Sequence, residues 1–251
     1  MTVLSVNLNV AALLRNRRNQ PWPDVLDLAR AALQAGAGGI TVHPRPDARH
    51  TRASDVHALR GLLASEFRDR ELNVEGYPDD RFLALVRDVG ADQVTLVPDA
   101  PDQPTSDHGW DFATHLDFLK TTVAQLKANG HRVALFADAD SHTMADAAAT
   151  GADRVELYTG PYGGAHGDAE AQMRELDRLA RTTKEALHQG LSVNAGHDLT
   201  VANLAPLVRH IPELAEVSIG HALFCDALTF GLSETVRRYL NACSGHDAQS
   251  A

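Results

Sequence analysis

The sequence predicts a (β/α)8 barrel, an α/β fold in one domain with extra helices. Short apolar runs and amphipathic helical stretches alternate from end to end of the 251-residue chain. Most of the apolar runs are continuous, which is typical of parallel strands covered on both faces. Eight such runs without a linker favour a closed barrel. A doubly wound open sheet remains the alternative topology.

Each predicted strand is a short run dominated by Val, Leu, Ile or Ala. The eight runs span residues 3–8, 38–43, 71–75, 92–97, 132–137, 153–158, 191–195 and 215–219. Glycines lie where the intervening helices should stop, each shortly before a strand. They are Gly36, Gly90, Gly130, Gly151 and Gly190.

The helices are predicted from their caps and from apolar residues that recur every three or four positions. Ser54, Asp79, Ser141 and Thr200 are expected to cap the helices after the second, third, fifth and seventh strands. Residues 112–126 and 173–187 place their apolar side chains on one helix face. Gly220 and His221 are expected to open the last helix.

Two stretches, 9–22 and 98–111, show no regular pattern. The second follows a strand and is long and polar, which makes it a candidate lid over the mouth of the barrel. The domain is expected to cover residues 1–243, and the polar tail 244–251 to be disordered.

Composition excludes several classes of protein. Hydrophobic residues make up 44% of the chain, which is ample for a core, and the net charge is -10. This charge argues against nucleic acid or an anionic membrane as partner. We find no signal peptide and no membrane-spanning run, and Cys225 and Cys243 are expected to be reduced thiols. We therefore expect a cytoplasmic protein.

Polar side chains follow most of the strands. Because the carboxyl ends of barrel strands face one mouth, these side chains should converge there. They are Asn7, Asn9, His43, Arg45, Glu75, Asp138, Glu156, Asn194, His197, Gly220 and His221. We interpret Asp138 and Asp140 as caps of the helix near Ser141. Glu156 could equally be a buried structural carboxylate.

The residue types at this mouth suggest proton transfer on an anionic substrate. Glu75 closes a buried strand, so a raised pKa would suit it to general base catalysis. His43 and His197 could relay protons near neutral pH. The backbone N–H groups at Gly220 and His221 form a helix N-terminus, where barrels often bind phosphate. Arg45 and Arg49 could add a local basic pocket.

Two negative observations narrow the chemistry. Lys120, Lys127 and Lys184 are the only lysines, and none ends a strand, so an enzyme-bound imine is not expected. A metal site built from His43, His50, Glu75 and His197 is disfavoured, because no HxH or HExxH spacing supports it.

Taken together, the motifs of this chain resemble the pyridoxine 5'-phosphate synthase family, the ring-closing enzymes of bacterial vitamin B6 synthesis. The resemblance covers nearly the whole chain, in matching order and spacing. The motifs are Val6-Asn7, Leu14-Arg15-Asn16, Gly39-Ile40-Thr41-Val42-His43, Arg49-His50, Asn73-Val74-Glu75, Leu96-Val97-Pro98, Ala137-Asp138-Ala139-Asp140, Val193-Asn194-Ala195-Gly196-His197 and Ile219-Gly220-His221-Ala222.

The resemblance implies a barrel with extra helices, assembled as an octamer. The reaction it implies joins 3-amino-2-oxopropyl phosphate to 1-deoxy-D-xylulose 5-phosphate and yields pyridoxine 5'-phosphate, phosphate and water. No metal or redox cofactor is implied. The amine comes from the substrate, which agrees with the lack of a strand-end lysine.

The resemblance also assigns roles to residues. It implies that His43 and Glu75 are proton acceptors and that His197 is a proton donor. Contacts to the aminoketone phosphate fall on Asn7, Arg18, Asp198, Gly220 and His221. Contacts to the deoxyxylulose phosphate fall on Asn9, Val10, Arg45, His50 and Thr105.

The chain departs from the family pattern at two places. Relatives commonly have Asp-His where this chain has Asn9-Val10, and Gly where this chain has Asp198. A carboxylate at position 198 would repel a phosphate unless it turns away. Two other functions remain open: another phosphosugar isomerase or epimerase, and a non-catalytic paralogue that binds a phosphometabolite.

Overall fold

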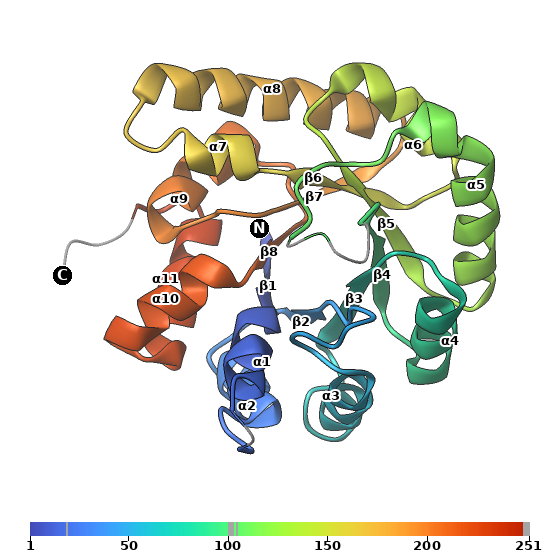
Figure 1. The fold of residues 1–251 in the computed structure, drawn as a ribbon. Helices are drawn as coiled ribbons and strands as arrows, with labels where there is room; N and C mark the ends of the chain where they lie inside the picture. The colour runs from blue at the N-terminus through green and yellow to red at the C-terminus, as the bar shows by residue number, and fades with distance from the viewer. Residues whose placement is uncertain (19, 100–102, 104, 248–251) are drawn as a thin grey trace.

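The chain folds into a closed barrel of eight parallel strands wrapped by helices (Figure 1). This computed structural model describes residues 1–18, 20–99, 103 and 105–247. The strands follow one another around the barrel in chain order, and β8 pairs with β1 to close it. They are β1 (Val3–Asn7), β2 (Gly39–Val42), β3 (Glu71–Gly76), β4 (Gln93–Leu96), β5 (Arg132–Ala137), β6 (Arg154–Tyr158), β7 (Ser192–Gly196) and β8 (Glu216–Ile219). The predicted (β/α)8 fold is confirmed, and the open sheet is excluded.

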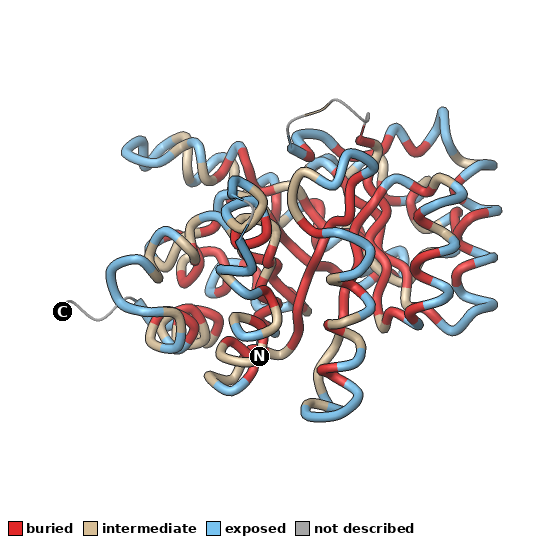
Figure 2. The backbone as a smooth tube through the Cα atoms, turned by 60° about the horizontal axis from the view of Figure 1, so that its bottom comes forward, coloured by how far each residue is buried: buried red, intermediate tan, exposed pale blue. Residues whose placement is uncertain are grey.

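Several strands alternate between apolar and polar residues, which the prediction of continuous apolar runs overlooked. In β2, buried Ile40 and Val42 flank Thr41, whose hydroxyl hydrogen-bonds Ser5 of β1 at 2.7 Å. Across the barrel, Gln93 of β4 donates to Glu216 of β8 at 3.2 Å. Polar side chains therefore hydrogen-bond inside the barrel, while the apolar side chains pack outward against the helices. Both sets are buried, and the strands at the centre of the molecule are mostly coloured as buried in Figure 2.

Among the described residues, α1 to α9 lie in the connections between strands, with two helices each after β1 and β6, and α10 and α11 follow β8. The helices are α1 (Asn9–Asn16), α2 (Val25–Gln34), α3 (Ala53–Glu66), α4 (Asp80–Val89), α5 (Phe112–Ala128), α6 (Met144–Ala149), α7 (Gly160–Gly164), α8 (Ala169–His188), α9 (Val201–His210), α10 (His221–Phe230) and α11 (Leu232–Cys243), with a 3-10 turn at Ser141–Thr143. The prediction of an irregular stretch over 9–22 is wrong, because α1 occupies its first half. The helix that opens at His221 is followed by α11, so it is not the last.

Two of the four predicted caps are correct. The Asp79 side chain accepts a hydrogen bond from Phe82 N, and Thr200 forms a capping box with Asn203. Ser54 is not a cap, because α3 begins one residue earlier, after Arg52. Ser141 is the first residue of the 3-10 turn, and Asp140 caps that turn by accepting from His142 N at 3.0 Å.

The predicted helix-ending glycines all adopt positive φ, from 65° at Gly90 to 112° at Gly36. A left-handed conformation suits glycine because it has no Cβ. These turns precede strands, so they lie at the end of the barrel opposite the carboxyl ends of the strands.

The two segments predicted to be irregular or disordered are described only in part. Of the stretch 98–111, residues 100–102 and 104 lie outside the described residues, as do 248–251 of the tail. Within the tail, the Arg209 guanidinium donates to the Gly245 carbonyl and to the Asp247 carboxylate, each at 2.8 Å. Among the described residues, no helix combines the length and apolar character needed to span a membrane.

Candidate active site

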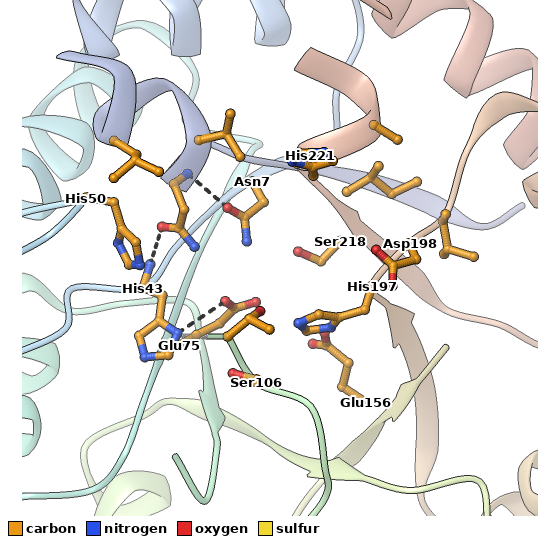
Figure 3. Close-up of a pocket in the computed structure, with 18 of the residues that line it drawn as sticks. Asn7, His43, His50, Glu75, Ser106, Glu156, His197, Asp198, Ser218 and His221 are labelled. Atoms are coloured by element: carbon orange, nitrogen blue, oxygen red, sulfur yellow. Dashed lines mark hydrogen bonds and ion pairs between the residues drawn. The ribbon is translucent and has the colours of Figure 1, made fainter. Parts of the chain in front are cut away.

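A cavity of about 210 Å³ opens at the carboxyl ends of the strands, where the sequence predicted that polar groups converge. Figure 3 shows its lining. The residues that line it are Asn7, Asn9, Val10, Leu13, His43, Arg45, His50, Glu75, Thr105, Ser106, Glu156, His197, Asp198, Leu199, Ser218, Ile219, Gly220, His221 and Ala222. Four residues predicted for the site or for the mouth do not line this cavity: Arg18, Arg49, Asp138 and Asn194. Arg18 is exposed near the end of α1. The buried Asn194 side chain accepts from Arg154 at 2.9 Å and donates to Gln93 at 3.4 Å instead.

His43 and Glu75 face each other on the cavity wall (Figure 3). Nδ1 of His43 lies 4.0 Å from Oε2 of Glu75, and both side chains are almost fully buried. Burial, reinforced by the negative charges of Asp99 and Glu216, raises the pKa of Glu75 to about 8. Burial and the positive charge of Arg45 hold the pKa of His43 well below its usual value. The pair therefore exists mainly as a neutral imidazole beside a carboxyl that titrates near pH 8.

Asn9 connects the ends of the first two strands to the loop that carries His50. Its side-chain Oδ1 accepts a hydrogen bond from the backbone N–H of His43 at 2.9 Å. The same oxygen accepts from the Thr51 hydroxyl at 3.2 Å. The Asn7 side chain in turn accepts from the backbone N–H of Asn9 at 2.9 Å. Asn9 thus fixes the backbone that presents His43 to the cavity.

The end of α1 supports the same loop. Nδ2 of Asn16 donates to the carbonyl oxygens of Ala48, Arg49 and His50, the last at 2.7 Å. His50 then packs edge-on against His43, with ring centroids 5.9 Å apart. Burial, followed by the charges of two nearby arginines, lowers the pKa of His50 to about 4. His50 is therefore neutral at physiological pH.

His197 is held in an unusual backbone conformation, with φ of 84°. The Thr159 hydroxyl donates to the carbonyl oxygens of His197 and Gly196, which fixes this turn. The imidazole packs against Phe136 and Tyr158, with centroid distances of 5.1 and 5.4 Å. Its Nδ1 is buried without a hydrogen-bond partner among the described residues. Burial lowers the pKa of His197, and the Asp198 carboxylate acts in the opposite direction.

Glu156 is a buried carboxyl on the cavity lining. It is 2% exposed, and its Oε2 has no hydrogen-bond partner among the described residues. Burial and the charges of Glu75 and Glu216 raise its pKa well above the usual value. A Cβ at position 196 would come within 2.6 Å of Oε1 of Glu156, so Gly196 allows the carboxyl to lie there.

The two arginines predicted to form a basic pocket are both engaged. Arg45 forms a buried ion pair with Asp99, and its Nη1 donates to the Gln103 carbonyl at 3.0 Å. Arg49 pairs with Asp47 and also donates to the Gln103 carbonyl, outside the cavity lining. The sequence analysis missed Asp99 because it follows a proline in a stretch without regular periodicity.

Gly220 is the N-cap of α10 and lies against β1. A Cβ on Gly220 would approach the Asn7 carbonyl oxygen to 3.0 Å, so the close approach favours glycine. The neighbouring Asp198 is exposed and has a φ of 55°. The Asp198 carbonyl accepts a hydrogen bond from Asn203 at 3.0 Å. The cavity thus joins a helix N-terminus to the His and Glu side chains opposite.

Other predictions concern residues outside the cavity. Asp140 caps a turn as expected, but the Asp138 side chain accepts from the backbone N–H of Gly109 at 3.1 Å instead. Lys120, Lys127 and Lys184 lie exposed on α5 and α8, away from the lining. Within the described part of the chain, no group of three His, Cys, Asp or Glu residues could hold a metal ion.

The fold is that of a (β/α)8-barrel protein, and its cavity is suited to acid–base chemistry, because buried carboxyl and imidazole groups face it at the strand ends. Residues 4–245 match the family described as pyridoxal phosphate biosynthesis protein PdxJ. The chain belongs to this family.

Named relatives agree with this membership. The chain is 62% identical over 242 residues to a pyridoxine 5'-phosphate synthase of Chelativorans sp. (strain BNC1), covering 96% of this chain and 98% of the relative. It is 60% identical to one of Allorhizobium ampelinum, with coverage of 96% and 97%.

Solved structures of distant proteins share the fold. A protein from Aquifex aeolicus VF5 superposes with a TM-score of 0.63 at 15% identity, covering 98% of this chain and 93% of that one. A phosphoribosylanthranilate isomerase from Thermotoga maritima gives a TM-score of 0.57 at 11% identity, with coverage of 98% and 100%. At such low identity these similarities bear on the fold alone.

Proposed function

We propose that this chain is a pyridoxine 5'-phosphate synthase. It condenses 3-amino-2-oxopropyl phosphate with 1-deoxy-D-xylulose 5-phosphate and releases pyridoxine 5'-phosphate, phosphate and water. One observation carries the proposal: a member of this family gathers His43, Glu75 and His197 around a single cavity that also contains a helix N-terminus.

Ring closure requires several proton transfers, and the cavity has groups suited to them. Glu75 and His43 act as proton acceptors, and His197 acts as a proton donor. A carboxyl with a pKa of about 8 and a neutral imidazole can exchange protons near neutral pH at small cost. The amine of the aminoketone attacks the sugar ketone directly, so an active-site lysine is not needed.

The two substrates occupy different sides of the cavity in this proposal. The aminoketone phosphate contacts Asn7, the main chain at Asp198, and the start of α10 at Gly220 and His221. The deoxyxylulose phosphate contacts the opposite wall, made by Asn9, Val10, Arg45, His50 and Thr105. Their positions on the cavity lining support these assignments. The assignment of Arg18 to the aminoketone lacks such support and rests on the family resemblance.

The direct test is an assay of the purified protein with both phosphorylated substrates. Chromatography should detect pyridoxine 5'-phosphate, and each product molecule should appear together with one free phosphate. Expression of the chain should also restore growth without pyridoxine to a bacterial strain that lacks its own synthase. Turnover of either substrate alone to an isomer, without phosphate release, would favour a phosphosugar isomerase instead.

We also infer from the family resemblance that the chain works in the cytoplasm as an octamer. Sedimentation velocity on the purified protein tests the assembly, because an octamer of a 27.0 kDa chain separates clearly from a monomer or dimer. Cell fractionation tests the location.

A further inference from the structure

Arg45 enters the cavity wall as one half of an almost fully buried ion pair. Its guanidinium Nη2 contacts Oδ2 of Asp99, and the two side chains are only 3% and 2% exposed. Asp99 lies three residues after Leu96, the last residue of β4, and follows Pro98. The Ser106 hydroxyl donates to the same carboxylate oxygen at 2.6 Å. Arg45 and Ser106 both line the cavity, whereas Asp99 stands behind them.

Asp99 makes the burial of Arg45 possible. A buried charge is strongly unfavourable unless a partner of opposite sign compensates it. The pair cancels the net charge of the guanidinium but leaves its plane and its remaining N–H donors fixed in direction. An arginine held in this way recognises an oxygen atom by hydrogen-bond geometry, because its long-range attraction for anions is reduced by the partner.

We propose that Asp99 is a positioning residue of this active site. It holds the guanidinium of Arg45 at the cavity wall as an oriented hydrogen-bond donor for the sugar phosphate, and Ser106 helps to fix the carboxylate by donating to the same oxygen. The proposal deepens the function proposed above and rests on it. It assigns to the pair a role in selecting the sugar substrate, and none in binding the aminoketone phosphate.

Asp99 also belongs to the charges that surround Glu75. The groups that act on the Glu75 carboxyl are Asp99, Glu216 and Arg45, together with the adjacent His43 and the buried carboxyl of Glu156, with which Glu75 interacts. The negative charge of Asp99 raises the pKa of Glu75, and the positive charge of Arg45 lowers it. Removal of the Asp99 charge, which also leaves Arg45 unpaired, should therefore lower the pKa of Glu75. The shift reports whether Asp99 is charged beside Arg45 and Glu75, which the proposal requires, whereas the two KM values report whether Asp99 positions Arg45.

Three variants separate charge from position. Asp99→Asn removes the charge at constant shape. Asp99→Glu keeps the charge but lengthens the side chain by one methylene, which displaces the guanidinium. Ser106→Ala is the matched control, because it removes a hydrogen bond to Asp99 and leaves both charges in place. Steady-state kinetics with each substrate varied in turn gives the two KM values.

We expect Asp99→Asn to raise KM for deoxyxylulose phosphate about 10- to 100-fold, the scale for misplacing a contact group. KM for the aminoketone phosphate should change less than about 2-fold, since that substrate does not contact Arg45 in our proposal. Asp99→Glu should also raise the sugar KM. Ser106→Ala should raise it less than Asp99→Asn does, because it removes one hydrogen bond to the carboxylate and leaves the ion pair in place. Equal KM changes for both substrates, or an unchanged sugar KM in both Asp99 variants, would overturn the proposal.

Titration of Glu75 tests the charge effect without any catalysis. Carbon NMR on protein labelled at the glutamate carboxyl groups follows Glu75, which Glu75→Gln identifies by loss of its signal. The midpoint should move to lower pH in Asp99→Asn and stay in place in Asp99→Glu and Ser106→Ala. An unmoved midpoint in a folded Asp99→Asn protein contradicts the proposal. If that variant does not fold, Asp99→Glu decides. A raised sugar KM with an unmoved midpoint supports the proposal, and an unchanged sugar KM contradicts it. Absence of activity in the unmodified protein would refute the proposed function and leave this titration interpretable.

Discussion

Glu75 and His197 are titratable side chains on the cavity lining; Glu75 is buried and His197 is half-buried. If they transfer protons in the reaction, their loss should affect turnover more than folding. We expect Glu75→Gln and His197→Ala each to lower kcat about 100-fold or more, the usual scale for a lost general acid or base. Single-turnover and steady-state assays with both substrates measure the effect.

Circular dichroism melting curves provide the control for these variants. Glu75→Gln keeps the shape of a side chain that burial already favours in its neutral form, so its fold should be retained. Turnover like that of the unmodified protein in either variant would remove that residue from the catalytic assignment.

Asn9 and Val10 stand where relatives commonly have Asp and His. The side-chain Oδ1 of Asn9 already accepts hydrogen bonds from the backbone N–H of His43 and from the Thr51 hydroxyl. A carboxylate oxygen of aspartate could accept both. The double change Asn9→Asp, Val10→His should therefore keep His43 in place and add polar contacts to the sugar. We expect KM for deoxyxylulose phosphate to fall about 2- to 13-fold, corresponding to one neutral hydrogen bond, with a smaller change in kcat.

The aminoketone KM should hardly move in this double variant, and it serves as the internal control. Val10→His alone separates the imidazole from the carboxylate. If the double variant loses activity, the pocket has been rebuilt around Val10, and the family's sugar contacts do not transfer to this stretch.

Part of the cavity lining could be predicted because strand-end positions converge in a parallel barrel. Val10, His50, Thr105 and Asp198 were expected only from the family resemblance. The sequence could not predict that Asp99 would pair with Arg45, since the two are 54 positions apart and no local pattern links them. It also left Glu156 undecided. Only the three-dimensional structure reveals that its carboxyl faces the cavity with an unpaired oxygen.

The N-terminus of α10 is the element proposed to bind the aminoketone phosphate. Backbone N–H groups and the helix dipole favour an anion at such a position. Gly220→Asp adds both bulk and negative charge there, whereas Gly220→Ala adds only the Cβ that would contact Asn7. We expect the aspartate variant to weaken aminoketone phosphate binding clearly more than the alanine variant does.

Isothermal titration with the aminoketone phosphate compares the two variants, and a phosphate-soaked crystal should show an anion at the start of α10. Equal affinity in Gly220→Asp and Gly220→Ala would mean that charge at this position is irrelevant, and the phosphate would then bind elsewhere.

At the level of elements, the strands and the main helices could be predicted, and the additional ones could not. The strands follow from short β-branched runs between glycines. Helix α1 was missed because Asn9 begins it directly after β1, with Leu8 as an N-cap that makes no side-chain hydrogen bond. The cap expected at Ser54 is at Arg52 instead, a residue type that is not among the usual N-caps. The Asp55 side chain fixes the start of α3 by accepting a hydrogen bond from the backbone N–H of Arg52.

The whole molecule should lose stability as the pH rises from 7 to 8. Glu75 titrates near pH 8 in the folded state, and Glu156 and Glu216 also have raised pKa values. Between the unfolded value near 4.5 and these raised values, the folded state binds more protons, so stability falls with rising pH. His43, His50 and His197 have lowered pKa values, and their contribution is complete above about pH 7.

Urea denaturation at pH 7 and pH 8 measures this decline, which amounts to at most about 1.4 kcal/mol per group and pH unit. Glu75→Gln should make the decline smaller, because the variant lacks the carboxyl that titrates near pH 8. A steeper decline in Glu75→Gln than in the unmodified protein would show that the sign assigned to Glu75 is wrong.

The helix-ending glycines and the cavity occupy opposite rims of the barrel, and this separation has a consequence for evolution. Mutations in the turns before the strands change the free energy of unfolding at a distance from the substrates. Mutations at the carboxyl ends of the strands change the active site and leave the sequence of those turns unchanged. Lineages in different habitats can therefore adapt one rim while inheriting the other, and an engineer can recombine the two rims from different relatives as separate modules.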